Sequence, residues 1–179
     1  MKKNCLYILL LTAIFLSCKK EVSELPPATQ TGANTFGGKV DGKFWVPAGF
    51  GIVPTAPILE ARFTPDSSLY INDRNFSSSP TETEFELFLK GVTAAGNYLL
   101  NTTVGYPSSS NNYGYFVKRN LTPENEWITS SQYTGSVHIT KIDALNQFIS
   151  GTFSFTAINL YNTPQVMSVT EGRFDVRIQ

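Results

Sequence analysis

Apolar and polar residues alternate with a period of two along most of the chain after residue 34. This alternation predicts β-strands with one buried face and one face in water. No window of eleven or more residues in this part carries an apolar stripe at the helical period, so we expect little helix. The alternation is clearest in residues 59–63, 69–71, 84–90, 137–140, 149–157 and 166–178.

Turn-forming residues separate the alternating runs. Asp41-Gly42 lies between two short runs and predicts a type I′ hairpin, which needs positive φ at both central residues. Residues 143–146 predict a second turn, and Glu171-Gly172 predicts a third, between residues 166–170 and 173–178. Strands joined in this way, without crossover helices, favour an all-β fold. We expect an antiparallel β-sandwich, with a lipocalin-like β-barrel as the alternative.

The start of the chain has a different pattern. Lys2 and Lys3 precede an apolar run that begins at Leu6 and ends with Phe-Leu-Ser-Cys at residues 15–18. A basic start and an apolar stretch too short to span a bilayer comfortably are typical of a signal peptide. Residues 15–18 resemble the lipobox of bacterial lipoproteins. That resemblance implies cleavage before Cys18 and attachment of lipid, such as palmitate, to this residue.

These patterns divide the chain into three parts. We expect a lipoprotein signal peptide in residues 1–17, a lipidated N-terminus and flexible tether in residues 18–34, and a single β domain in residues 35–179. Pro26-Pro27 gives the tether extended polyproline geometry. The expected partner is a membrane, through the lipid on Cys18. The expected location is the cell envelope, as an outer-membrane lipoprotein that faces the periplasm or the cell surface.

A resemblance to a known family appears at both ends of the predicted domain. The motifs are Leu-Pro-Pro-Ala-Thr-Gln-Thr-Gly-Ala-Asn-Thr-Phe-Gly at residues 25–37, residues 40–47, and the motifs at 150–155 and 171–175. They resemble an uncharacterised family of small lipoproteins from Bacteroidota, and residues 54–132 are not covered. Because that family has no known activity, the resemblance implies no catalytic residues. The Cys-Lys-Lys-Glu start at residues 18–21 is similar to signals for display on the outer face of the outer membrane.

Charge and composition restrict the classes of ligand. The chain has 14 basic and 14 acidic residues, so no net positive charge favours nucleic acid as a partner. Cys5 lies in the predicted signal peptide, which leaves Cys18 as the only cysteine beyond it. With one histidine and no closely spaced acidic loop, the sequence supports no zinc or calcium site. We expect no metal and no cofactor, and the oligomeric state stays open.

Two groups of residues are candidates for catalysis. His138 is predicted on the wet face of a strand near Ser136 and Ser154, but no Gly-x-Ser-x-Gly elbow accompanies them. Carboxylates at Glu82, Glu84 and Glu86, or at Glu124 and Glu126, could form a glycosidase pair. For residues 82–86 we favour a solvated strand edge, where charge prevents aggregation. We therefore expect no catalytic residues and no enzyme; a hydrolase and a purely structural envelope protein are the alternatives.

The best candidate for a binding surface is the segment of residues 101–120, which is rich in Tyr, Ser, Gly and Asn. This composition is typical of binding loops, in which rigid rings lie beside adaptable hydrogen-bonding groups. It is also ordinary turn chemistry. We predict a binding module that contacts a glycan or a protein through this loop. The predicted ligand-binding residues are Tyr106, Asn111, Asn112, Tyr113 and Tyr115.

Overall fold

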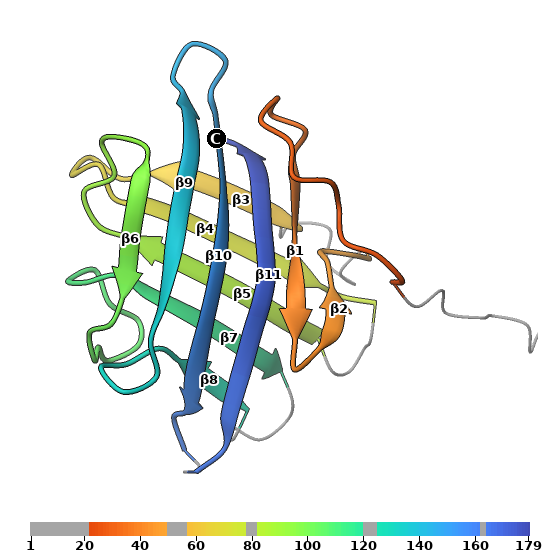
Figure 1. Ribbon diagram of the computed structural model, residues 1–179, viewed down its shortest axis with the longest axis vertical. Helices are drawn as coiled ribbons and strands as arrows, with labels where there is room; N and C mark the ends of the chain where they lie inside the picture. The colour runs from red at the N-terminus through yellow and green to blue at the C-terminus, as the bar shows by residue number, and fades with distance from the viewer. Residues whose placement is uncertain (1–21, 50–56, 78–81, 120–124, 162–163) are drawn as a thin grey trace, which may run out of the picture.

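The computed structural model describes residues 22–49, 57–77, 82–119, 125–161 and 164–179 (Figure 1). The regular elements in these ranges are all β-strands. Among the described residues, no helix is long and apolar enough to cross a membrane. The strands are β1 (Thr35–Val40), β2 (Lys43–Trp45), β3 (Leu59–Phe63), β4 (Leu69–Asn75), β5 (Glu82–Leu89), β6 (Gly96–Leu100), β7 (Tyr113–Arg119), β8 (Glu126–Ile128), β9 (Gly135–Asp143), β10 (Phe148–Asn159) and β11 (Val166–Arg177).

These strands form one antiparallel sheet that curls back on itself. One layer has the order β6-β9-β10-β11-β1-β2, and the other has the order β8-β7-β5-β4-β3. The long strand β10 joins the layers, because it pairs with β9 along residues 148–155 and with β8 at residues 158–159. The strands of the second layer cross behind the first (Figure 1). The predicted antiparallel all-β fold is confirmed, and the curled sheet combines features of a sandwich and of a barrel.

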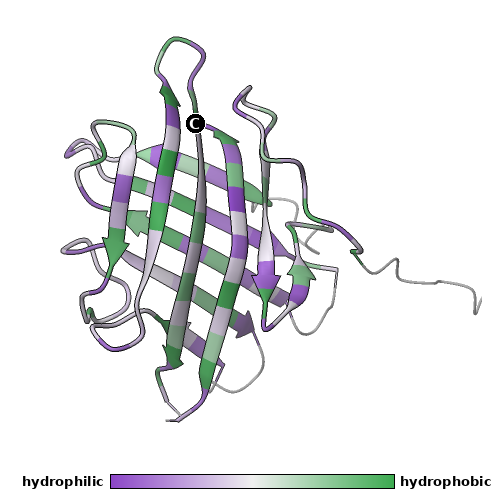
Figure 2. Cartoon of the chain, in the orientation of Figure 1, coloured by the Kyte–Doolittle hydropathy of each residue, from purple (hydrophilic) through white to green (hydrophobic). Residues whose placement is uncertain are grey.

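Aromatic side chains fill the space between the two layers. The ring of Phe85 lies at the centre, 4.7 Å from Trp45, 5.7 Å from Phe36 and 4.9 Å from Phe116 between centroids. Phe36 also stacks on Phe153 at 5.1 Å. Edge-to-face and offset pairs of this kind add stability beyond the burial of their area. The alternation that predicted the strands is visible along them as apolar and polar bands (Figure 2).

The predicted hairpin at Asp41-Gly42 is present. Their φ angles of 48° and 78° are both positive, as a type I′ turn requires. The long hairpin of β9 and β10 is present as well, with Asn146 capping its turn through a 2.9 Å bond from its N–H to Asp143. Local sequence therefore determines both turns.

The predicted turn at Glu171-Gly172 is wrong. Strand β11 continues through these residues as a β-bulge, where the register against β1 shifts between the pairs Gly37–Arg173 and Lys39–Thr170. Glu171 has a φ of 53°, and a Cβ on Gly172 would lie only 2.5 Å from the Phe153 ring. The same dipeptide suits a turn or a bulge, and the ladders to β1 and β10 select the bulge.

The folded part begins earlier than residue 35. The carboxylate of Asp175, on the outer face of β11, accepts hydrogen bonds from the hydroxyl of Thr29 at 2.6 Å and from backbone N–H groups at residues 31–33, at 2.9–3.1 Å. Ser150 donates to the same carboxylate at 2.7 Å. Residues 29–34 are therefore an arm bound to the domain, which corrects the predicted end of the free tether at residue 34. The predicted signal peptide and Cys18 lie outside the described residues.

The Asp175 carboxylate should make stability depend on pH. Burial alone would raise the pKa of Asp175, but the hydrogen bonds from Thr29, Thr31, Ala33 and Ser150 hold it well below its ordinary value. A carboxylate with a lowered folded pKa stabilises the protein above its unfolded pKa of about 4, and the stabilisation is lost as the pH falls below that value. The decrease in the free energy of unfolding at acid pH therefore measures how strongly Asp175 holds the arm.

We predict that Asp175→Asn lowers the free energy of unfolding by about 2–3 kcal/mol at neutral pH, because hydrogen bonds to a charged acceptor are lost. The loss should shrink as the pH falls below about 4, because the unfolded wild-type chain then takes up a proton on Asp175 that the folded carboxylate, with its lowered pKa, does not bind. Urea unfolding across this pH range measures both effects. Glu24→Gln, at an exposed position, is the control. An Asp175→Asn curve parallel to the wild-type curve at all pH values would contradict the prediction.

Candidate binding site

The tyrosines predicted to bind ligand belong to a second apolar cluster. Tyr113 and Tyr115 lie on β7 rather than in a loop, and only 1% and 3% of their surfaces are exposed. They point to the outer side of the second layer, where Tyr106 covers them. The sequence pattern placed both residues in a loop, whereas they are buried strand residues, because the loop of residues 101–112 folds over the strand that follows it. The cluster also contains Phe88, Val117 and Ile128, with Tyr70 and Val104 packed against it.

Three tyrosine hydroxyls converge on one buried carboxylate, that of Glu86. Tyr70 and Tyr106 donate to its Oε2 at 3.1 and 3.0 Å, and Tyr113 donates to its Oε1. Burial, together with the negative charge and hydrogen bonds of Glu86, raises the pKa of each of these phenols well above its ordinary value, so they remain donors. Tyr115 donates instead to Glu126, at 2.8 Å. This arrangement fixes the loop on the sheet.

The run at residues 82–86 is not a solvated strand edge, because β5 lies between β4 and β7. Glu84 and Glu86 are only 6% and 4% exposed. Glu84 accepts hydrogen bonds from Asn72 at 2.6 Å and from two nitrogens of Arg119 at 2.9 and 2.5 Å. Glu84 and Glu86 thus each have their own donors. Glu124, the other predicted candidate beside Glu126, lies outside the described residues.

The two predicted asparagines hold the loop in different ways. Asn112 accepts a bond from the N–H of Lys90 at 2.7 Å and donates to the carbonyl of Leu99 at 3.0 Å. Asn111 is exposed and reaches only Ser110, at 3.3 Å. Tyr106 is half-buried and stacks flat on Tyr115, with 3.7 Å between ring centroids. The five predicted residues therefore do not gather on one open surface, and ligand binding by them stays a prediction.

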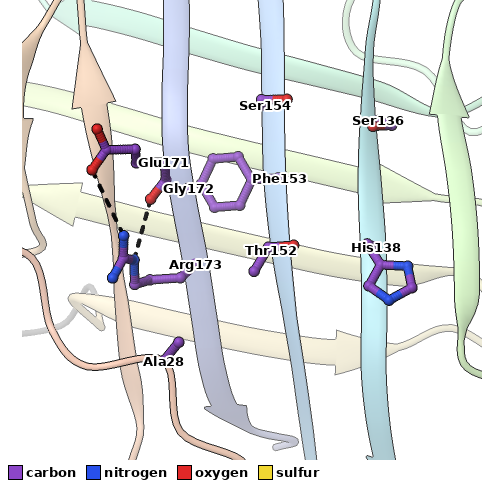
Figure 3. Close-up of a pocket in the computed structure, with 9 residues that line it drawn as sticks. All are labelled: Ala28, Ser136, His138, Thr152, Phe153, Ser154, Glu171, Gly172 and Arg173. Atoms are coloured by element: carbon purple, nitrogen blue, oxygen red, sulfur yellow. Dashed lines mark hydrogen bonds and ion pairs between the residues drawn. The ribbon is translucent and has the colours of Figure 1, made fainter.

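An open groove lies on the outer face of β9, β10 and β11 (Figure 3). Its volume is about 400 Å³. His138, Thr152 and Arg173 follow one another across the three strands in register, and Ser136 faces Ser154 in a neighbouring row. The groove is lined by Ala28, Ser136, His138, Thr152, Phe153, Ser154, Glu171, Gly172 and Arg173.

The groove offers hydrogen-bonding groups on a rigid support. Nδ1 of His138 shares a 2.7 Å hydrogen bond with Asn97, and no hydrogen bond joins His138 to Ser136 or Ser154 in the described structure. Arg173 donates through Nε to the carbonyl of Glu171 at 3.2 Å, while its Nη2 lies 3.9 Å from that residue's carboxylate. The arginine therefore has further N–H groups for a ligand.

Sequence reasoning placed part of this groove. The exposed position of His138, and its closeness to Ser136 and Ser154, were predicted from the alternation in β9 and β10. Arg173 was missed, because a turn at residues 171–172 would break β11 there. Only the continuous strand places Arg173 beside Thr152 of β10. Within the described ranges, no three His, Cys, Asp or Glu side chains are grouped to hold a metal ion.

Tyr106→Phe should keep the ring stacked on Tyr115 and remove one donor from Glu86. We expect a loss of about 1.5–3 kcal/mol in the free energy of unfolding, the usual size for a hydrogen bond to a charged group. Urea denaturation measures it. Tyr161→Phe, at a position that is 56% exposed, should change little. Equal stability of Tyr106→Phe and the parent would show that this hydroxyl does not hold the loop.

Comparison with known proteins identifies a family for the chain. Residues 33–176 match the family model described as Domain of unknown function (DUF6252). This range includes residues 54–132, which the motif resemblance left out. No curated protein and no solved structure matches the chain. The expected membership of an uncharacterised family is confirmed at this level, and the chain belongs to the family of the domain DUF6252.

Proposed function

We propose that the protein is a non-enzymatic, lipid-anchored module of the cell envelope, which binds a glycan through the groove on β9, β10 and β11. The observation that carries this proposal is the row of His138, Thr152 and Arg173 in cross-strand register. It combines an imidazole, a hydroxyl and a guanidinium on one face. Such groups donate to and accept from sugar hydroxyls.

The shape of the groove supports an extended ligand. Neighbouring strands lie about 4.8 Å apart, so the sheet presents polar groups at a regular spacing across the face. Side chains on paired strands are held in place before binding, which reduces the entropy cost of binding. Phe153 also lines the groove, but its ring is only 4% exposed and belongs to the main core, so the surface offered to a ligand is chiefly polar. The hydroxyls of a sugar ring match such a surface.

The position of the arm supports a site close to an anchor. Residues 18–28 separate Cys18 from Thr29, the first residue bound to Asp175. This stretch reaches at most about 35–40 Å when fully extended. Ala28 lines the groove, so the N-terminal segment passes beside the proposed site. A lipid on Cys18 would therefore keep the groove near the membrane surface.

Arg173→Ala should weaken glycan binding at least tenfold, because a hydrogen bond from a charged group is worth about 1.5–3 kcal/mol. The measurement is binding of the full chain to arrayed glycans, followed by titration of each glycan retained. Arg177→Ala is the matched control, since Arg177 lies on the same strand and is exposed. Equal losses in both variants, or no retained glycan, would contradict the assignment of the groove. Retention of a protein from the same envelope instead would assign the groove to a protein partner.

The anchor has a separate test. Mass spectrometry of the native protein should show a chain that begins at Cys18 and carries acyl groups. Cys18→Ser should leave the first seventeen residues attached and abolish labelling with radioactive palmitate. A native chain that retains residues 1–17 without fatty acid would rule out the anchor.

A further inference from the structure

A second groove opens along the seam where the curled sheet closes. Several contacts cross this seam. The N–H of Gln179 bonds to the carbonyl of Ala61 on β3 at 2.9 Å, and Ala48 bridges to Asn75 at the end of β4. No ladder joins β1 to β3 in the described structure. The groove between them has a volume of about 900 Å³, within the usual range for small-molecule sites.

The walls of this seam groove are mostly apolar. Leu25 and Pro26 of the N-terminal segment form one wall of the groove. Val46 and Leu59 contribute to its remaining walls. Phe36, which is only 2% exposed and belongs to the main core, also lines it. Phe36 belongs to the main core and Leu59 packs against it, so the edge of the main core forms the floor of the groove.

A carboxyl group without a partner lies beside this groove. Asp73 of β4 stands directly opposite Leu59 on one side and Phe85 on the other, and it shares the inward face of Leu69 and Ile71. The residue is 0% exposed, and neither carboxyl oxygen has a hydrogen-bond partner. Such groups are rare in native proteins, because burying an unpaired polar group is costly.

The environment keeps this carboxyl neutral. Burial raises the pKa of Asp73 well above its ordinary value, and the charge of Arg74 offsets only part of that effect. A neutral carboxyl presents one O–H donor and one carbonyl acceptor side by side. The chemical group that matches both is another carboxylic acid or a primary amide. A pure hydrocarbon would leave the carboxyl unpaired, and a charged head group would lose its hydration.

We propose that the seam groove binds a single-chain amphiphile with a carboxylic acid or primary amide head group, which enters head first and pairs with Asp73. The apolar walls then contact the hydrocarbon chain. A folded partner protein does not fit this site, because the Asp73 carboxyl is fully buried between Leu59 and Phe85 of the neighbouring strands, where only a narrow head group could reach it. This inference is independent of the glycan groove and of the lipid on Cys18.

Trp45 can report on binding. Its ring lies 6.0 Å from that of Phe36, which lines the groove, and 4.7 Å from that of Phe85, which flanks Asp73. The experiment uses the full chain with Cys18→Ser, so that no attached acyl group competes, and with Trp127→Phe, so that Trp45 is the only tryptophan. The probes are tetradecanamide brominated at carbon 2 and tetradecanamide brominated at carbon 14, since bromine quenches tryptophan fluorescence at short range. We expect saturable quenching, stronger with bromine at carbon 2.

Two substitutions at Asp73 separate pairing from packing. Asp73→Leu should weaken binding of the carbon-2 probe at least tenfold while raising the melting temperature, because an unpaired polar group is removed from the core. Asp73→Asn still offers a donor and an acceptor and should bind within about threefold of the parent. Leu145→Gln, at a position that is 91% exposed on a distant hairpin, should leave binding unchanged. Quenching that does not saturate, equal binding by Asp73→Leu, or stronger quenching from carbon 14 would each overturn the proposal.

Discussion

The pairing of buried carboxylates with dedicated donors organises the parts of this structure that are not strands. Asp175 collects donors from the N-terminal arm, and Glu86 collects three phenols, one of them from the loop of residues 101–112. Glu84 receives the guanidinium of Arg119 at the end of β7. A carboxylate removed from water needs such donors to remain ionised. Asp175 and Glu86 therefore each fix a distant segment to one face of the sheet, and Glu84 links β5 to the neighbouring strand β7.

The strands themselves could be predicted from local patterns. Alternation identified β9 and β10 with their inward residues, and Asp41-Gly42 was enough to place its hairpin. The contacts of the outward-facing side chains could not be predicted in this way. The period of two indicates only which face of the sheet a residue occupies. Glu86 occupies the predicted face, but the loop of residues 101–112 covers that face.

The candidate groove shows the same limit. His138 could be placed because one hairpin determines its neighbours Ser136 and Ser154. Arg173 could not, because its position depends on whether Glu171-Gly172 reverses the chain or bulges within a strand. Both conformations need positive φ at Glu171, and only pairing with β1 and β10 distinguishes them. The seam groove was not predictable either, since its walls come from segments far apart in sequence.

The clasp at Asp175 also determines how the domain bears mechanical load. A pull on the N-terminus is passed by the hydrogen bonds of residues 29–33 to β11, which is flanked by β1 and β10 inside its layer. The force therefore acts on an interior strand with hydrogen bonds along both edges, and many bonds share it. Without the bonds to Asp175, the N-terminal segment would pull on β1 alone. Only the three-residue strand β2 lies beyond β1 in its layer, so the hydrogen bonds of β1 would break one after another from the edge of the sheet. The arm of residues 29–34 therefore spreads a pull on the N-terminus over the hydrogen bonds of an interior strand.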